Sequence, residues 1–87
     1  MMNKLEQEII NTIAEEREID KGEITPDSNL YDLGIDSLSS LEILVALGKK
    51  YDITITESRL KNVISVREIV RVVSSELKKK QRKYHVA

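Results

Sequence analysis

The chain contains no cysteine, no tryptophan and no phenylalanine among its 87 residues. The absence of cysteine excludes a disulfide scaffold, and any thiol chemistry must come from an added cofactor. No run approaches the roughly 20 apolar residues of a membrane span, so we expect no stable membrane insertion. The N-terminus is charged from Lys4 onward and lacks the apolar core of a secretory peptide. These absences fit a helical domain of the cytoplasm or an organelle matrix, and we predict the cytoplasm.

Residue types that carry catalysis or bind metals are also scarce. Nucleophilic catalysis by a serine needs a base within hydrogen-bond reach. The single histidine, His85, lies close to the end of the sequence without an obvious orienting partner. The chain has no glycine-rich phosphate loop and no Cys or His spacing typical of metal ligands. We therefore predict no enzymatic activity, no catalytic residue and no metal site.

Charge is distributed unevenly along the sequence. Residues 1–77 contain all fifteen acids and nine bases, a net charge of −6, whereas residues 78–87 contain five bases. An acidic body disfavours a nucleic-acid-binding protein, because phosphate contacts need positive charge on the folded surface. It suits partners with basic docking patches. We predict one folded domain at residues 1–77 and a basic C-terminal tail at residues 78–87.

Two interpretations of the basic tail remain open. The simpler one is a frayed helix end and solvated arm. The other is an electrostatic contact with an acidic partner or an anionic membrane surface.

Helical spacing of apolar residues predicts the first half of the fold. A first helix at residues 3–18 begins with a capping box, in which Asn3 and Glu6 bond each other's backbone amides. A long connection follows at residues 19–35. Its apolar anchors are Ile19, Ile24, Leu30 and Leu33.

A second helix is predicted at residues 37–50, with Asp36 as its N-cap. Its apolar residues form two stripes separated by more than a right angle. The first stripe is a core face made of Ile43, Leu44, Leu47 and Tyr51. The second stripe consists of Leu38, Leu41 and Val45. It is either covered by the first helix and the long connection, or exposed as a docking strip.

The C-terminal half of the fold is predicted to contain two more helices. A short helix falls within residues 54–62, with Thr56 as its cap. Ser65 starts a final helix, with Glu68 three residues on completing a capping box. The buried side of this helix consists of Ile69, Val70, Val72 and Val73. Because β-branched residues favour strands, strand pairing of residues 69–73 is the competing interpretation.

Ser37 is the candidate functional residue because it stands where the second helix begins. Unpaired backbone amides and the positive end of the helix dipole make such a position suitable for a phosphate. Taken alone, the serine is either an ordinary N-terminal helix residue or the attachment point of a phosphate ester. Gly34, in the turn before the helix, is predicted to supply a positive φ or a close backbone approach.

The stretch 33–38 reads Leu-Gly-Ile-Asp-Ser-Leu, and with its surroundings it resembles the acyl carrier protein family. The signature of that family is Gly-x-Asp-Ser-Leu, and its serine carries a 4′-phosphopantetheine arm. The similarity continues through residues 39–55, back to residues 24–30 and on to residues 66–70. It implies an all-α four-helix bundle with a long loop between helices 1 and 2 and a short third helix.

The resemblance also implies a chemistry for this site. Ser37 would carry the phosphopantetheine covalently, flanked by Asp36 and Leu38. Its hydroxyl would attack the β-phosphate of coenzyme A in a reaction catalysed by a separate phosphopantetheinyl transferase with Mg²⁺. Acyl groups would then be held as thioesters by a monomeric carrier that visits acyl-loading and acyl-processing enzymes.

Family members dock their partners through the second helix, which here implies a partner surface. Its residues would be Leu38, Leu41, Glu42 and Val45. Fatty-acid carriers usually place acids just after the serine and near the end of this helix. This sequence instead has serines and lysines at those places, and bases in the third helix: Ser39, Ser40, Lys49, Lys50, Arg59 and Lys61. The thinned acidic surface indicates a specialised fatty-acid, polyketide or related carrier.

Two other functions remain open from the sequence. An aminoacyl or peptidyl carrier has the same fold and the same arm. An unmodified helical interaction module would use the strip at Leu38, Leu41 and Val45 to bind a partner helix.

Overall fold

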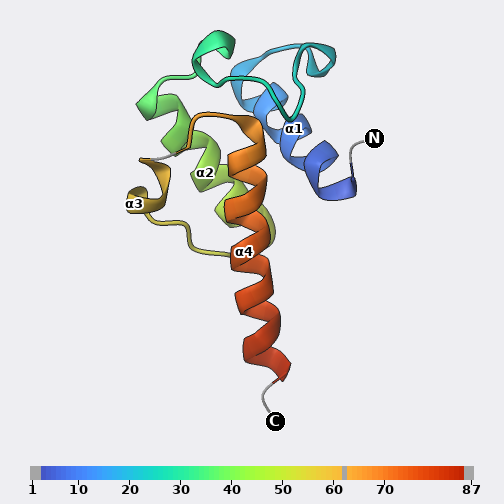
Figure 1. Ribbon diagram of the computed structural model, residues 1–87, viewed down its shortest axis with the longest axis vertical. Coiled ribbons are helices and arrows are strands. Elements are labelled where there is room, and N and C mark those ends of the chain that lie inside the picture. The colour runs from blue at the N-terminus through green and yellow to red at the C-terminus, as the bar shows by residue number, and fades with distance from the viewer. Residues whose placement is uncertain (1–2, 62, 86–87) are drawn as a thin grey trace.

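The computed structural model describes residues 3–61 and 63–85, and these form an all-α bundle, as predicted (Figure 1). Its helices are α1 (Lys4–Arg17), α2 (Ser37–Tyr51), α3 (Glu57–Leu60) and α4 (Val66–His85). Two short 3₁₀ turns interrupt the long connection between α1 and α2: η1 (Lys21–Glu23) and η2 (Tyr31–Leu33). α1 packs against both α2 and α4, whereas α3 contacts α2. None of the described helices is long and apolar enough to cross a membrane.

The core is built from aliphatic side chains of α1, α2, α4 and the long connection. The predicted core face of α2 is buried at Ile43, Leu44 and Leu47, whereas its Tyr51 is only partly buried. Of the predicted loop anchors, Ile24 and Leu30 are buried, and Ile19 and Leu33 are partly buried. Ile35 and Val66, which the sequence pattern did not single out, are also buried. Among the residues whose side chains the structure describes, the buried apolar ones are Ile9, Ile10, Ile13, Ala14, Ile24, Leu30, Ile35, Ile43, Leu44, Leu47, Val66, Ile69 and Val73.

The ends of α1 and α2 are defined by specific hydrogen bonds. The capping box at the start of α1 is present: Asn3 Oδ1 accepts from the Glu6 amide at 2.8 Å, and the Asn3 amide donates to Glu6 Oε1 at 2.9 Å. At the end of α2, the Tyr51 hydroxyl donates to Glu8 Oε1 of α1 at 2.7 Å. Burial, with this hydrogen bond, raises the pKa of Tyr51 above its usual value. The two helices are thus linked at the edge of the core.

The long connection holds the start of α4 through backbone pairing. The amides of Val66 and Arg67 donate to the carbonyl oxygens of Ser28 and Pro26, at 3.1 and 2.9 Å. Loop carbonyls therefore satisfy helix amides that have no partner within α4. The amide of Leu30 donates to the carbonyl oxygen of Ile64 at 2.8 Å, so the connection is fixed on both sides of the turn before α4.

The predicted capping box of α4 is half present. The Glu68 carboxylate accepts from the Ser65 amide at 3.1 Å, as expected. The Ser65 hydroxyl donates to the same carboxylate at 3.2 Å instead of accepting from the Glu68 amide. Residues 69–73 are helical, so the strand interpretation was wrong. Of the predicted buried side, Ile69 and Val73 lie one helical turn apart and are buried, whereas Val70 and Val72 are only half-buried. The burial of β-branched residues within a helix shows that tertiary packing outweighs the local preference.

The third helix is shorter than predicted. Of the predicted range 54–62, residues 57–60 are helical, and residue 62 lies outside the described residues. Residues 53–56 have no regular structure. Thr56 occupies the N-cap position, but its hydroxyl lies 3.0 Å from Ser58 Oγ and makes no capping bond. Before this segment, Gly48 permits a close approach, because a Cβ there would lie 2.9 Å from the Ile53 carbonyl oxygen.

α4 extends well past the rest of the bundle, along the long axis of a molecule measuring 44 × 29 × 19 Å (Figure 1). The start of the predicted basic tail is therefore helical. Lys80 Nζ donates to the Tyr51 carbonyl oxygen at 3.2 Å and lies 3.3 Å from Asp52 Oδ2. This cation lies at the C-terminal end of α2, where a helix dipole favours positive charge.

Candidate functional site

Ser37 is the first residue of α2 and is exposed. The turn before it depends on Gly34, which has a φ of 76° and closes η2 in the left-handed conformation, as predicted. Nothing lies within 4 Å of a Cβ built at Gly34, so the backbone conformation, not space, favours glycine there. Next, the buried Ile35 bonds its amide to the Leu30 carbonyl oxygen at 2.9 Å. These contacts present the Ser37 hydroxyl to solvent at the positive end of the helix dipole.

Asp36 is the N-cap of α2, as predicted. Its Oδ1 accepts a hydrogen bond from the Ser39 amide at 2.9 Å. This bond, with a smaller contribution from the Ser39 hydroxyl, lowers the pKa of the Asp36 carboxyl below its usual 3.8. The carboxylate is committed to the helix start and is a weaker base than an ordinary aspartate. It is therefore poorly suited to activate the neighbouring hydroxyl.

The second apolar stripe of α2 is exposed, which rejects the interpretation that α1 and the loop cover it. Leu38 is 68% exposed and Val45 is 51% exposed, and Leu41 between them is half-buried. Glu42 is also exposed. The other large apolar side chains exposed in the described part of the chain are Tyr31 at 66% and Ile64 at 51%.

A groove of about 630 Å³ adjoins Ser37 and gathers most of these exposed residues. One wall consists of the start of α2, and the other consists of α3 and the residues that follow it. The buried Leu30 and Ile35 also contribute to the lining. The described residues that line it are Leu30, Tyr31, Ile35, Ser37, Leu38, Ser40, Leu41, Glu57, Lys61, Val63 and Ile64. The groove is mainly apolar with a few polar groups, a combination suited to an aliphatic chain.

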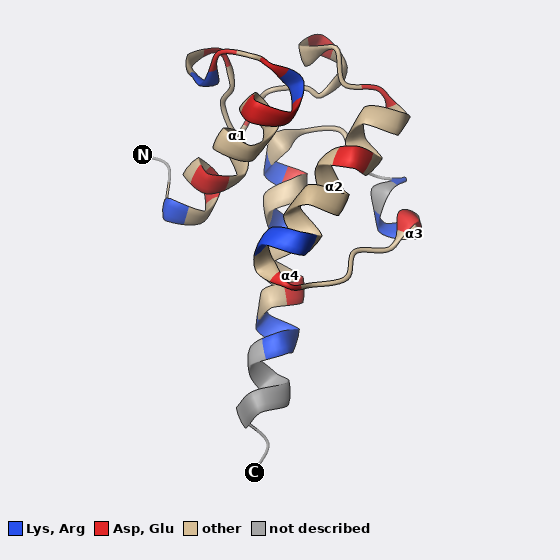
Figure 2. Cartoon of the chain, turned by 180° about the vertical axis from the view of Figure 1, so that it is seen from behind, with Lys and Arg blue, Asp and Glu red and all other residues tan. Residues whose placement is uncertain are grey.

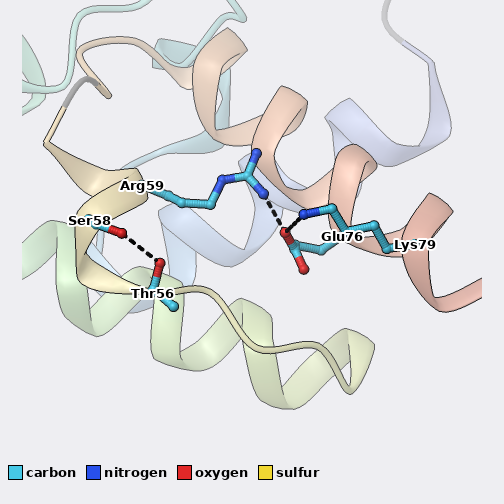
Figure 3. Close-up of polar contacts among 5 residues, drawn as sticks. All are labelled: Thr56, Ser58, Arg59, Glu76 and Lys79. Carbon is cyan, nitrogen blue, oxygen red and sulfur yellow. Dashed lines mark hydrogen bonds and ion pairs between the residues drawn. The ribbon is translucent and has the colours of Figure 1, made fainter.

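The α3 wall is tied to α4 by an ion pair (Figure 3). Arg59 donates to Glu76 Oε2, and Lys79 Nζ lies 3.4 Å from the same oxygen. The Glu76 side chain is only 18% exposed and that of Arg59 is 33% exposed, so this pair is less screened than a surface ion pair. The contact links α3 to α4 through Arg59, which is not among the described groove residues.

The two neighbouring lysines at the end of α2 have different neighbours. Lys49 lines a shallow hollow of about 350 Å³ together with Leu41 and Val45, on the side of the exposed stripe. Lys50 Nζ lies 3.4 Å from Thr12 Oγ1 of α1. Only Lys49 therefore belongs to the surface that also contains Leu38 and Val45.

The chemical group that the described part of the site offers is the exposed Ser37 hydroxyl. Within residues 3–61 and 63–85, no three His, Cys, Asp or Glu side chains come together as a metal site. The side chain of His85 lies outside the described residues. Sequence reasoning missed Tyr31, Val63 and Ile64 as groove residues, because only the fold brings η2 and the segment after α3 beside Ser37.

Comparison with known proteins is consistent with this geometry. Residues 7–73 match the family model described as the phosphopantetheine attachment site. An acyl carrier protein of Helicobacter pylori (strain J99) is 31% identical over 68 residues, which cover 77% of this chain and 87% of the relative. An acyl carrier protein of Prochlorococcus marinus (strain MIT 9515) is 30% identical over 71 residues, covering 80% of this chain and 89% of the relative.

Proposed function

The chain belongs to the acyl carrier protein family, and we propose that its Ser37 is the residue to which 4′-phosphopantetheine is attached. Members of this family are carriers that hold this group covalently, and they are not enzymes. The observation that carries this proposal is the exposed Ser37 hydroxyl at the first position of α2, beside an apolar groove. The groove offers room for an acyl chain, and the hydroxyl is accessible to a modifying enzyme. The residues present therefore fit the group.

The proposed attachment is a phosphoryl transfer from coenzyme A. The Ser37 oxygen forms a bond to the β-phosphorus, the bond from this phosphorus to the oxygen that bridges the two phosphates breaks, and adenosine bisphosphate leaves. The hydroxyl proton goes to a base of the separate transferase, since Asp36 is engaged with the Ser39 amide. Once attached, the arm supplies a thiol for thioester formation. The protein contributes the anchor, the dipole of α2 and the apolar groove.

Intact-mass measurement tests this assignment. Incubation with coenzyme A, Mg²⁺ and a broad-specificity phosphopantetheinyl transferase is expected to add the mass of one phosphopantetheine. Ser37→Ala is expected to abolish the gain, and Ser40→Ala serves as the matched control because this serine lies one turn along the same helix. An unmodified wild-type protein, or full modification of Ser37→Ala, would refute the assignment and leave an unmodified interaction module as the better description.

We further propose that partner enzymes dock on the exposed stripe of α2. Leu38, Leu41 and Val45 supply the apolar contact, and Glu42 supplies the charge that a basic partner recognises. Lys49 lies on the same surface, which supports a specialised fatty-acid, polyketide or related pathway. The proposal places the carrier domain at residues 1–77, the basic tail at residues 78–87 and the protein in the cytoplasm as a monomer, where coenzyme A and the transferase would meet it.

A further inference from the structure

A basic face of α4, which shares no described lining residue with the groove, has no role in the proposed carrier chemistry. Arg71 and Lys78 are separated by seven residues, nearly two turns of helix, and so lie on one line along α4. Together with Val70, Ser74, Ser75 and Lys79 they line a shallow hollow of about 400 Å³. Both are exposed, and neither forms an ion pair within the described part of the chain.

The charge of the molecule is separated along its long axis (Figure 2). Lys and Arg recur toward the projecting end of α4, where Lys78, Lys79 and Lys80 follow one another. Exposed acids predominate at the opposite end, where α1 ends and the long connection begins: Glu15, Glu16, Glu18, Asp20 and Glu23. The molecule, whose longest extent is 44 Å, is therefore richer in bases toward the end of α4 and richer in acids where α1 ends.

We infer that the basic face of α4 binds electrostatically to an anionic membrane surface. A projecting helix end can reach a flat surface while the acidic end stays remote from it. At physiological ionic strength charges are screened over about 8 Å, so the acidic end adds little repulsion in this orientation. Clusters of four to eight Lys or Arg on an amphipathic helix are typical of binding to acidic lipids. The contact is peripheral, since five of the six described residues that line the hollow are polar or charged.

The distribution of charge on the molecule favours a lipid surface over a second copy of this chain as the binding partner. In self-association, the basic face would meet the acidic end of a neighbour, but Arg17 and Lys21 interrupt the acids there. A bilayer containing acidic lipids has no such interruption. Self-association is therefore an outcome that the test must distinguish.

Co-sedimentation of the unmodified full chain with vesicles provides the test. Vesicles with one phosphatidylglycerol for every two phosphatidylcholines are compared with vesicles of phosphatidylcholine alone, at low salt and at ~0.15 M salt. We expect binding to the anionic vesicles only, weakened by salt. Each cation near such a surface changes the partition coefficient by about fivefold, so Arg71→Gln with Lys78→Gln is expected to weaken binding by roughly 25-fold.

The matched control is Lys4→Gln with Lys21→Gln, which removes the same charge from exposed positions on α1 and η1. It is expected to bind like the wild type. Equal loss in both variants would overturn the inference, because net charge and not the α4 face would then be responsible. Failure to bind anionic vesicles at low salt, or binding to neutral vesicles, would also overturn it. So would salt-sensitive self-association in light scattering without vesicles, since the basic face would then contact another copy.

Discussion

Asp36 and Ser37 are adjacent, but their side chains have different tasks. The Asp36 carboxylate accepts from the Ser39 amide and stabilises the start of α2, which leaves the Ser37 hydroxyl exposed. The Ser39 amide also explains why the pKa of Asp36 is lowered. A capping acid directly before the proposed attachment serine thus defines the place where the helix begins and where the hydroxyl is presented.

The capping role of Asp36 makes stability depend on pH in acid. Since the folded-state pKa lies below the usual 3.8, the stabilisation is fully present above that value and is lost as pH falls through the folded-state pKa. We expect Asp36→Ala to lower the Tm by roughly 5 °C at neutral pH. Asp36→Asn should retain the cap but lose this part of the acid dependence. Thermal unfolding by circular dichroism between neutral and acidic pH measures both, and an equal Tm for Asp36→Ala and wild type would contradict the role.

Individual lysines show what a residue pattern does not reveal. Lys78, Lys79 and Lys80 are consecutive, yet only Lys80 contacts the Tyr51 carbonyl oxygen at the end of α2. Lys49 and Lys50 likewise diverge, toward the exposed stripe and toward α1. The sequence predicts a basic segment correctly, but the partner of each cation depends on helix phase relative to neighbouring elements. Such contacts are not encoded locally.

At the scale of the element, the helices were predictable where periodicity and caps agreed. Asn3 with Glu6 and Asp36 mark the starts of α1 and α2, and both starts are confirmed. The turns η1 and η2 were missed because each has three residues and no periodicity. The β-branched run in α4 left the strand interpretation open, since only packing against α1 decides it. The groove was not predictable, because one of its walls follows from the position of α3.

The α3 element depends on its ion pair with α4, which yields a prediction. We expect Glu76→Gln to lower the free energy of unfolding by about 1 kcal/mol, because a charged pair becomes a weaker neutral hydrogen bond. Hydrogen exchange of the α3 amides, including Arg59, should become faster. Asp27→Asn is the control, since it breaks the Arg67–Asp27 ion pair of 2.7 Å at the long connection. Unchanged exchange in α3 after Glu76→Gln would show that other contacts hold this helix.

The whole molecule presents two surfaces of different charge to its surroundings. The exposed stripe of α2 has one acid and one base, Glu42 and Lys49, whereas α4 projects a basic face. Partners that recognise acids on α2 should bind this carrier weakly, because Lys49 repels their bases. Surface charges of this kind affect the choice of partner and the association rate more than the fold.

Charge reversal at α2 tests this account of partner choice. We expect Lys49→Glu in the phosphopantetheine-loaded carrier to raise kcat/KM with generic fatty-acid enzymes by roughly fivefold, since it replaces a repulsive base by an acid. Lys50→Glu changes the net charge equally but lies beside Thr12, so it should have little effect. Steady-state measurement of kcat/KM for both variants tests this expectation. Equal gains would attribute the effect to net charge, and no gain from Lys49→Glu would reject the account.

The segment between Ile53 and Ile64 is anchored by the Gly48 carbonyl oxygen at one end and by the Leu30 amide at the other. Between these anchors, the described residues form one ion pair to another element, that of Arg59 with Glu76, and Ile55 and Val63 pack against the core. When an acyl chain fills the groove, we expect this segment to be displaced more easily than α2 or α4. We therefore expect the protein to accommodate short and long cargo with similar ease, so that selection of chain length rests with the enzymes it serves.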